Sequence, residues 1–360
     1  MPKIVISGFY GFDNCGDEAV LFSMLHCLRG ELPDARFVVL SGNVGKTREV
    51  YGVGAVDRWN PFRVFIELLR CDLLISGGGS LLQDVTGSRS CDYYLGVIKM
   101  ALFLRKKVMI YSQGIGPLIL DSNRSAVAKV LERCDVITLR DSASADLLRE
   151  IGVTRDIRVT CDPVMAVDAE NAECLMLNAE SGGRPLLAVM VRAWNDNRHY
   201  SRVAEFLDGQ VKKGWDILFV PAHFPDDNDA SKRVAEFMAC ESSCVDRCLS
   251  AHEFLGLTAC ADRVFSMRLH GLICAMAMGT PFIGLSYDPK VDAFMEQAGL
   301  TKFCLSFDEF DSADAMRVME EMDLALENEA WRVELERRRL EMRMLAMEPA
   351  KIAKELIFSG

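Results

Sequence analysis

The chain has 360 residues, half of them hydrophobic, with 41 Lys and Arg against 52 Asp and Glu and a formal net charge of −11. This length exceeds one ordinary hydrophobic core and predicts two domains. The acidic balance argues against nucleic-acid binding, which needs clustered cations, but local cations in a cleft could still hold a small anion.

The first eleven residues lack the charged, apolar and small-residue regions of a signal peptide, and no apolar run approaches the roughly 18 residues of a membrane span. The 13 cysteines are scattered, which favours a reducing cytoplasm. Cys240, Cys244 and Cys248 recur every fourth residue. A closed zinc site wants four ligands, so we expect ordinary thiols on a helix face or in loops.

Short β-rich runs alternate with helical stretches in the first half of the chain. Strands are expected at 3–7, 36–40, 72–76, 107–112 and 136–139. Helices are expected at 17–29, 93–104, 122–133 and 142–150. This repetition predicts a parallel sheet with helices on both faces.

A polar stretch at 169–184, rich in Glu, Asn, Ser and Gly, marks a domain boundary, and the pattern then restarts. Strands are expected at 186–192, 217–221, 263–266 and 281–286, with helices at 200–213, 229–240, 251–261 and 269–278. We therefore predict two similar α/β domains facing across a cleft, over 1–168 and 184–311. A helical segment follows over 312–360, with a charged, solvated face.

Polar and glycine-rich segments follow the strands of the first domain. After the first strand, Asn14, Asp17 and Glu18 place hydrogen-bonding groups at the start of a helix. Their carboxylates would repel a pyrophosphate but suit hydroxyl recognition or a general base, although Asp17 could equally cap the helix. The segments 76–84 and 112–117 are weaker signals singly, but all three should open on one edge of the sheet.

Two arginines end strands. Arg140 follows the strand at 136–139, and Arg192 ends the first strand of the second domain. Each could bind a carboxylate or phosphate bidentately, or could pair with a neighbour such as Asp141. Both alternatives stay open for both arginines.

The strongest cluster lies in the segment 267–291. Arg268 and His270 stand at a strand-to-helix turn, and Lys290 follows the next strand. A helix N-terminus attracts anions, and histidine exchanges a proton near neutral pH, so we expect a functional anion site here. The remaining histidines lack such a context: His26, His199, His223 and His252.

Five motifs together resemble those of the polysaccharide pyruvyltransferases. They are G-F-Y-G-F-D-N-C-G-D-E-A-V-L, S-G-G-G-S-L-L-Q-D, Y-S-Q-G-I-G-P-L, M-R-L-H-G-L-I-C-A-M-A-M-G-T-P and S-Y-D-P-K-V. They cover nearly the whole chain in order, and the resemblance is best to the bacterial branch that modifies secondary cell-wall polymers for S-layer attachment. Cys15, His223 and Gly271 depart from the pattern, which leaves acceptor specificity open.

The resemblance implies two Rossmann-like domains of the glycosyltransferase-B type and an enzyme that uses phosphoenolpyruvate as co-substrate, with no further cofactor and no metal. The product would be a 4,6-pyruvate ketal on a hexose or N-acetylhexosamine, with N-acetylmannosamine favoured, in a cell-wall polysaccharide precursor. A lipid-linked acceptor would bring the protein to the inner face of the plasma membrane. The sequence does not indicate an oligomeric state.

The resemblance also implies roles for individual residues. Arg268 and Lys290 would hold the donor's anionic groups, with Arg140 or Arg192 completing the clamp. His270 would bind phosphate or protonate the enol methylene. The acceptor would face Asn14, Asp17, Glu18 and Gln83.

Two alternatives remain. A nucleotide-sugar-dependent glycosyltransferase could use the same fold, since one fold supports several chemistries. A non-catalytic glycan-binding protein is less favoured, because the three cations of the second domain are retained together. A dehydrogenase is least favoured, for want of the dinucleotide fingerprint.

Overall fold

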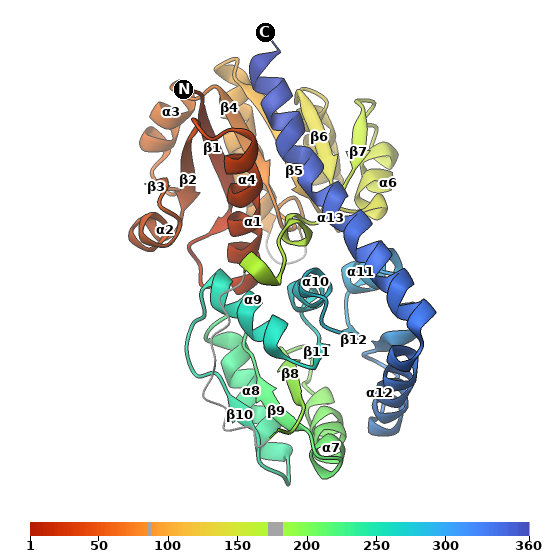
Figure 1. Cartoon of the computed structure of the whole chain (residues 1–360). Coiled ribbons are helices and arrows are strands. Elements are labelled where there is room, and N and C mark those ends of the chain that lie inside the picture. Colours follow the sequence, from red (N-terminus) through yellow and green to blue (C-terminus); the bar gives the residue numbers. More distant parts are fainter. Residues whose placement is uncertain (85–87, 172–182, 360) are drawn as a thin grey trace. The chain divides into compact units, whose positions relative to one another are not determined.

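The computed structural model describes residues 1–84, 88–171 and 183–359. They form two compact units, each built on its own parallel sheet (Figure 1). The first unit comprises Met1–Phe12, Val20–Ala166 and Met342–Gly360, and the second comprises Asp13–Ala19 and Val167–Glu341. The expected α/β fold class with parallel strands is confirmed.

The first unit holds a seven-stranded sheet in the order β3-β2-β1-β4-β5-β6-β7. Its strands are β1 (Lys3–Tyr10), β2 (Arg36–Ser41), β3 (Gly54–Asp57), β4 (Leu73–Gly77), β5 (Lys107–Gln113), β6 (Val136–Leu139) and β7 (Ile157–Val159). The helices between them are α1 (Cys15–Glu31), α2 (Val44–Tyr51), α3 (Pro61–Leu69), α4 (Ser88–Phe103), α5 (Asp121–Leu131) and α6 (Ser142–Glu150), and η1 (Pro163–Ala166) is a 3-10 turn.

The strands of this sheet are apolar at successive positions because both faces are covered. In β1, Ile4 and Val5 point to opposite faces and both are buried. The Val5 face packs on helices α3 to α6, which contribute residues such as Val64, Leu95 and Leu148 to one hydrophobic core. Such burial on both sides is typical of a doubly wound sheet.

The second unit holds a six-stranded sheet in the order β10-β9-β8-β11-β12-β13. Its strands are β8 (Leu186–Met190), β9 (Asp216–Phe219), β10 (Ser243–Cys244), β11 (Arg263–Ser266), β12 (Phe282–Ser286) and β13 (Cys304–Ser306). Its helices are α7 (His199–Lys212), α8 (Asp226–Phe237), α9 (Ala251–Cys260), α10 (Leu269–Met278), α11 (Pro289–Gln297) and α12 (Ser312–Glu327), with 3-10 turns η2 (Ala169–Asn171) and η3 (Thr301–Phe303).

Both sheets reverse their strand order next to their first strand. In the first unit the chain runs from β1 to β2 on one side and later places β4 on the other side of β1. In the second unit β9 and β11 flank β8 in the same way. Loops at such a reversal diverge beyond the carboxyl ends of the strands, which is where open α/β sheets bind ligands.

Local signals in the sequence begin and end the helices of the second unit. Ser250 and Glu253 form a capping box that starts α9. Asp288 caps α11, whose first residue is Pro289, and Gly279 ends α10 with φ +77°. The helix boundaries around the predicted anion site therefore follow from short sequence motifs.

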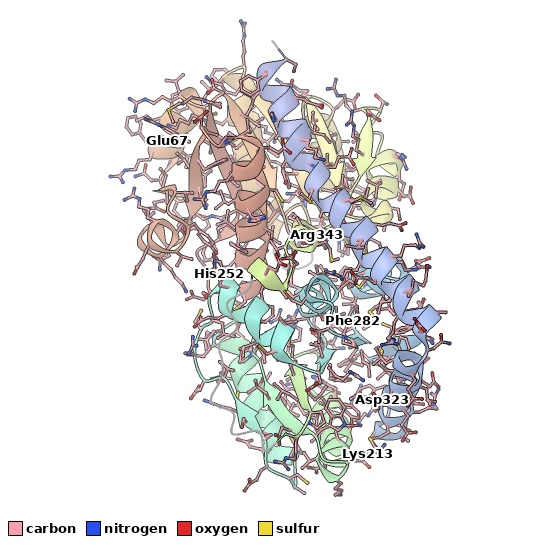
Figure 2. All side chains as sticks on the ribbon, viewed as in Figure 1. Glu67, Lys213, His252, Phe282, Asp323 and Arg343 are labelled. Atoms are coloured by element: carbon pink, nitrogen blue, oxygen red, sulfur yellow. The ribbon has the colours of Figure 1, made fainter. Side chains whose placement is uncertain are left out.

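The C-terminal helical segment consists of α12 and α13 (Glu329–Phe358). Two ion pairs hold α12 to the second unit, Lys213 with Glu320 at 2.6 Å and Arg263 with Asp323 at 2.9 Å; Lys213 and Asp323 are labelled in Figure 2. The boundary between the two units falls within α13: its residues up to Glu341 belong to the second unit, and those from Met342 onward belong to the first. The resemblance noted in the motifs also implies that the domain at 1–168 binds the acceptor and the domain at 184–311 binds phosphoenolpyruvate, and this division stays a prediction.

None of the helices within residues 1–84, 88–171 and 183–359 combines the length and the apolar character that a bilayer crossing requires.

Candidate functional site

The carboxyl edge of the second sheet gathers the predicted donor residues. Arg192 lies just beyond β8, Arg268 and His270 lie beyond β11, and Lys290 lies beyond β12. These three strands are neighbours and run parallel, so the segments after them emerge at the same edge. The cluster also stands at the reversal of strand order between β8 and β11.

Arg268 is the N-cap residue of α10 and is bound by a carboxylate from α8. Its Nε donates to Asp227 Oδ2 at 2.8 Å, and its Nη2 donates to Asp227 Oδ1. Asp227 is almost fully buried, whereas 17% of the Arg268 side chain is exposed. The guanidinium is thus held in one orientation by a two-point contact, which is common for a planar guanidinium paired with a carboxylate.

The charge of Arg268 is secured by its surroundings. Burial disfavours the protonated guanidinium, but the Asp227 carboxylate, helped by Tyr287 and Asp226, outweighs burial and raises the pKa of Arg268. Arg268 therefore stays cationic while part of it remains open to solvent.

Tyr287, which follows β12, connects the other two cations. Arg192 Nη1 donates to the Tyr287 hydroxyl at 2.8 Å, and the Arg192 guanidinium carbon lies 5.1 Å from the ring centroid. Lys290 Nζ lies 5.9 Å from the same centroid and 3.0 Å from Asp288 Oδ2. The Lys290 side chain is 36% exposed. Arg192 and Lys290 thus flank one tyrosine, and Arg268 follows the neighbouring strand β11 at the same edge of the sheet.

His199 supports Arg192 from α7. Its Nε2 is 3.0 Å from the Arg192 carbonyl oxygen, and its ring packs against Tyr200 and Phe307. Burial lowers the pKa of His199. A neutral imidazole whose Nε2–H donates to the carbonyl fits this contact, so His199 helps to fix the backbone that carries Arg192.

The start of α1 belongs to the second unit and packs against His270. The backbone of Cys15 donates to the Ala222 carbonyl at 2.7 Å, and Asn14 forms a β-bridge with His223. A Cβ at Gly16 would lie 2.4 Å from His270 Nδ1. Only glycine leaves room for the imidazole at this point.

The predicted acceptor residues divide between the units. Asn14 Oδ1 accepts from the backbone of Gly16 at 3.1 Å and of Asp17 at 3.4 Å, so this amide caps α1. Asp17 and Glu18 stand half-buried in the first turn of α1, in the same unit as His270. Gln83 lies in the first unit, beyond β4.

Arg140 also lies in the first unit, where its side chain is only 6% exposed. Its Nη1 contacts Asp162 Oδ2 at 3.3 Å, its Nε contacts Asp141 Oδ2 at 3.4 Å, and its Nη2 donates to the Ser80 hydroxyl at 2.9 Å. The pairing with Asp141, one of the two alternatives from the sequence, is present. Arg140 belongs to the first unit, whereas the residues around Tyr287 belong to the second, and its part in the donor clamp stays a prediction.

Three important contacts of this site escape sequence reasoning. Tyr287 stands inside the S-Y-D-P-K-V motif, which was the available signal for it. Asp227 lies 41 positions before Arg268, and His223 donates its backbone N–H to Asp227 at 3.0 Å. The His223–Asp227 contact is local, but no local pattern links Asp227 to Arg268, because that contact exists only once the sheet has formed.

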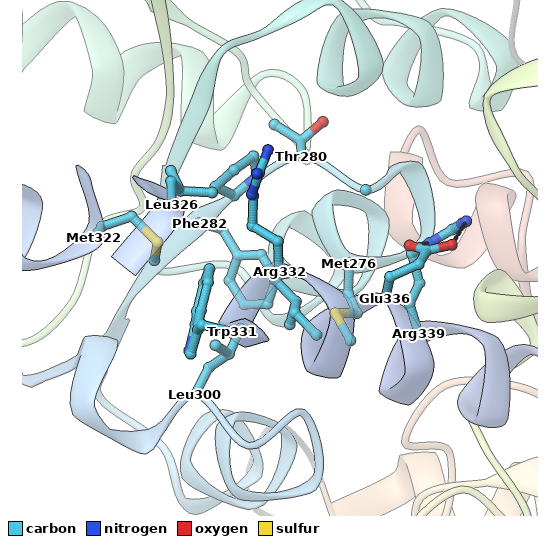
Figure 3. Close-up of a pocket in the computed structure, with 13 residues that line it drawn as sticks. Met276, Thr280, Phe282, Leu300, Met322, Leu326, Trp331, Arg332, Glu336 and Arg339 are labelled. Carbon is cyan, nitrogen blue, oxygen red and sulfur yellow. Dashed lines mark hydrogen bonds and ion pairs between the residues drawn. The ribbon is translucent and has the colours of Figure 1, made fainter. Parts of the chain in front are cut away.

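A separate pocket of about 190 Å³ opens at the other end of β12 in the second unit (Figure 3). Its lining is mostly apolar and includes Phe282, Met322 and Trp331, with the charged Arg332 and Glu336 also present. Phe282 begins β12, whereas Tyr287 and Lys290 follow its end. This pocket is therefore distinct from the cation cluster.

The three regularly spaced cysteines do not share a helix face. Cys240 follows α8, Cys244 lies in β10, and Cys248 lies in a loop. The helix-face expectation was wrong because α8 ends at Phe237; the loop expectation holds for Cys240 and Cys248. In the part of the chain that the structure describes, no group of three or more His, Cys, Asp or Glu could hold a metal ion.

Sequence comparison identifies relatives of this chain. Residues 14–289 match the family model described as polysaccharide pyruvyl transferase. The amylovoran biosynthesis protein AmsJ of Erwinia amylovora is 20% identical over an alignment of 258 residues, and the match covers 65% of this chain. The match spans 61% of the length of that relative.

Structure comparison identifies the same architecture in a glycosyltransferase and in an epimerase. A glycosyltransferase from Rickettsia africae is similar with a TM-score of 0.66 and 12% identity, covering 100% of this chain and 99% of the other. The UDP-GlcNAc 2-epimerase of Neisseria meningitidis, bound to UDP-GlcNAc, is similar with a TM-score of 0.63 and 10% identity, covering 100% of each chain. At such identity the likeness shows the glycosyltransferase-B-like fold alone.

Proposed function

The chain belongs to the polysaccharide pyruvyl transferase family, and on that premise we propose that it transfers the pyruvyl group of phosphoenolpyruvate to a polysaccharide precursor. The acceptor is a hexose or N-acetylhexosamine, and the product is a 4,6-pyruvate ketal with release of phosphate. One observation carries the proposal: Arg192 and Lys290 flank Tyr287, and Arg268 follows the neighbouring strand β11, so three cations of the second unit stand at the edge of the sheet where α/β folds bind ligands.

The donor's charges match these cations. Phosphoenolpyruvate carries a phosphate and a carboxylate, and guanidinium groups bind both in a planar, two-point geometry. Arg268 and Lys290 are each held by one carboxylate and are partly exposed, so each can turn a free donor toward a bound anion. Arg192, bonded to the Tyr287 hydroxyl, completes the clamp in preference to the buried Arg140.

His270 acts on the reacting carbon atoms of the donor. It gives a proton to the C3 methylene, which becomes a methyl group and leaves positive charge on C2. One sugar hydroxyl adds to C2 and loses its proton. The C2–O bond to phosphate then breaks, phosphate leaves, and the second hydroxyl adds to C2 with loss of its proton. One of the two hydroxyl protons replaces the proton that His270 gave to the methylene, and the departing phosphate takes up the other, so the steps balance.

The start of α1 supplies the acceptor side of this reaction. Asp17 and Glu18 are half-buried in the first helical turn, and Asn14 orders that turn by capping it. Either carboxylate can take a proton from an attacking hydroxyl, and a hydroxyl or amide group of the sugar can bond the other. Gln83 of the first unit is a further acceptor contact in this proposal.

The finer assignment follows the resemblance noted in the motifs. We place the chain near the branch that modifies secondary cell-wall polymers for S-layer attachment, with N-acetylmannosamine as the acceptor sugar. The reaction would take place in the cytoplasm, at the inner face of the plasma membrane, where a lipid-linked acceptor is available to a peripheral enzyme.

The direct test is to incubate the purified chain with phosphoenolpyruvate and a synthetic N-acetylmannosaminyl glycoside, following phosphate release and the mass of the sugar product. We expect a product heavier by one pyruvate ketal and a loss of turnover in His270→Ala. Full turnover in that variant would refute the role of His270. A reaction with galactosyl or glucosyl glycosides alone would replace the acceptor but retain the chemistry.

A second candidate comes from the fold neighbours. Because a glycosyltransferase shares the architecture, a nucleotide-sugar donor is the alternative. Thermal-shift titration separates the two donors: we expect stabilisation by phosphoenolpyruvate and none by UDP- or GDP-sugars. The reverse result would favour the glycosyltransferase.

A further inference from the structure

An aromatic cluster surrounds a buried arginine at the carboxyl edge of the first sheet. Arg58 follows β3 and is 4% exposed. Its guanidinium carbon lies 4.2 Å from the ring centroid of Tyr93 and 5.1 Å from those of Phe12 and Trp59. These three rings and Arg58 are called the aromatic cluster below. None of them has a role in the proposed donor chemistry.

The position of Arg58 is determined by the backbone around it. Its N–H donates to the Ser41 carbonyl at 3.1 Å, and its Nη1 donates to the Gly8 carbonyl at 2.8 Å. Gly8 lies where the register between β1 and β2 shifts, after Ser7 and before Tyr10. Arg58 therefore satisfies a carbonyl at the irregular end of β1, and its charge organises the aromatic rings around it.

The cluster presents an aromatic surface to solvent. Trp59 is 64% exposed although tryptophan has the largest side chain, and its ring lies 5.5 Å from that of Tyr93. Phe12 stacks on Phe9 at 4.4 Å, and both are partly exposed. The Arg58 Nε is buried and makes no hydrogen bond in the described part of the chain. An exposed indole thus lies beside a buried guanidinium that still has a hydrogen-bond donor to offer.

We propose that the aromatic cluster is a subsite for a sugar ring of the acceptor polysaccharide, stacked on Trp59. The C–H groups on one face of a pyranose carry partial positive charge and contact the negative face of an aromatic ring. The cluster lies at the carboxyl edge of a parallel sheet, where hydroxyl groups of the sugar also find loop residues. The proposal rests on the proposed function for its ligand, since that function supplies a polysaccharide.

The alternative occupants of such a surface are a second copy of this chain and another protein. A sugar fits better because the exposed part is a single indole beside a tyrosine rather than a broad aliphatic patch, and aromatic faces bind sugars with few other contacts. A protein interface would need a larger buried area.

The test measures sugar binding without the reaction. The probe is the methyl glycoside of a disaccharide that contains N-acetylmannosamine. Saturation-transfer NMR and calorimetry should show that it binds the wild-type chain. Trp59→Ala should weaken binding and raise the acceptor KM about tenfold or more, as loss of one stacking ring does. Trp59→Phe should restore part of the affinity. Phe103→Ala is the matched control, because Phe103 is 78% exposed in the same unit, at the end of α4.

The outcomes separate this inference from the proposed function. Phosphoenolpyruvate should bind Trp59→Ala as it binds the wild type. If product forms and the acceptor KM of Trp59→Ala equals that of Phe103→Ala, the subsite is refuted while the transfer stands. If the wild type binds the disaccharide but neither binds nor consumes phosphoenolpyruvate, the transfer fails and the subsite stands. A change of oligomeric state in Trp59→Ala, with sugar binding intact, would overturn the subsite in favour of an interface.

Discussion

The cations at the strand ends of the two sheets differ in their burial and in their number of partners. In the first unit Arg140 is 6% exposed and contacts two carboxylates and a hydroxyl, and Arg58 is buried among aromatic rings. In the second unit Arg268 retains 17% exposure and contacts a single carboxylate, and Lys290 is 36% exposed. A cation with many internal partners supports the fold, whereas a partly exposed cation with one partner can also bind a ligand. Residue type alone does not distinguish the two.

The largest effect is expected from breaking the Arg268–Asp227 pair. Arg268→Met should abolish phosphate release and should lower the free energy of unfolding by about 3 kcal/mol, because it leaves Asp227 buried without its cation. The double variant Arg268→Met with Asp227→Asn should recover much of the stability but none of the activity. Urea unfolding and a phosphate-release assay measure the two quantities. Recovery of activity together with stability would make Arg268 purely structural.

The next effect concerns the space around His270. Gly16→Ala places a Cβ 2.4 Å from His270 Nδ1, so the ring must shift and turnover should fall about 100-fold, as when a proton donor is misplaced. Gly30→Ala in the same helix is the control, since a Cβ there meets no atom within 4 Å. It should keep full turnover and be slightly more stable, because alanine favours a helix. Equal turnover in the two variants would argue against a catalytic His270.

Smaller effects, on stability in one variant and on the KM for phosphoenolpyruvate in the other, should distinguish the role of Arg140 from that of Arg192. Arg140→Met should lower the free energy of unfolding by about 2 kcal/mol or more, because Asp162 loses its partner, with little change in the KM for phosphoenolpyruvate. Arg192→Met should raise that KM about tenfold with a smaller stability change, because it removes a charged contact to the donor. Steady-state kinetics and thermal unfolding decide this, and a raised KM in Arg140→Met alone would return Arg140 to the clamp.

The smallest effect is a pH dependence from His199. Burial lowers its pKa below the ordinary value of 6.5, so below that pH the unfolded chain binds a proton that the folded chain resists. Stability contributed by the neutral ring is present above pH 6.5 and is lost as the pH falls through that value toward the folded pKa. His199→Gln should therefore lose less stability than the wild type between about pH 7.5 and 5.5. The measurement is the Tm of both proteins across that pH range. If the Tm of the variant and of the wild type change equally with pH, this role of His199 is excluded.

Much of the fold was predictable from short patterns. The apolar runs of β1, β4 and β5 and the loops after them predicted a parallel sheet and its functional edge. The polar helix α2 and the four-residue strand β3 were missed because neither carries a clear apolar period, and Arg58 follows that strand. The aromatic cluster was missed with them.

By itself, the sequence determined which residue types stand at the strand ends of this protein, because strand and helix periods are local properties of neighbouring residues. The tertiary structure decided which of those side chains share a site. It pairs Arg268 with an aspartate 41 positions away, places Gly16 under His270, and retains Arg140 in the other unit. Such pairings depend on strand order and on the packing of loops after distant strands, which no local period encodes.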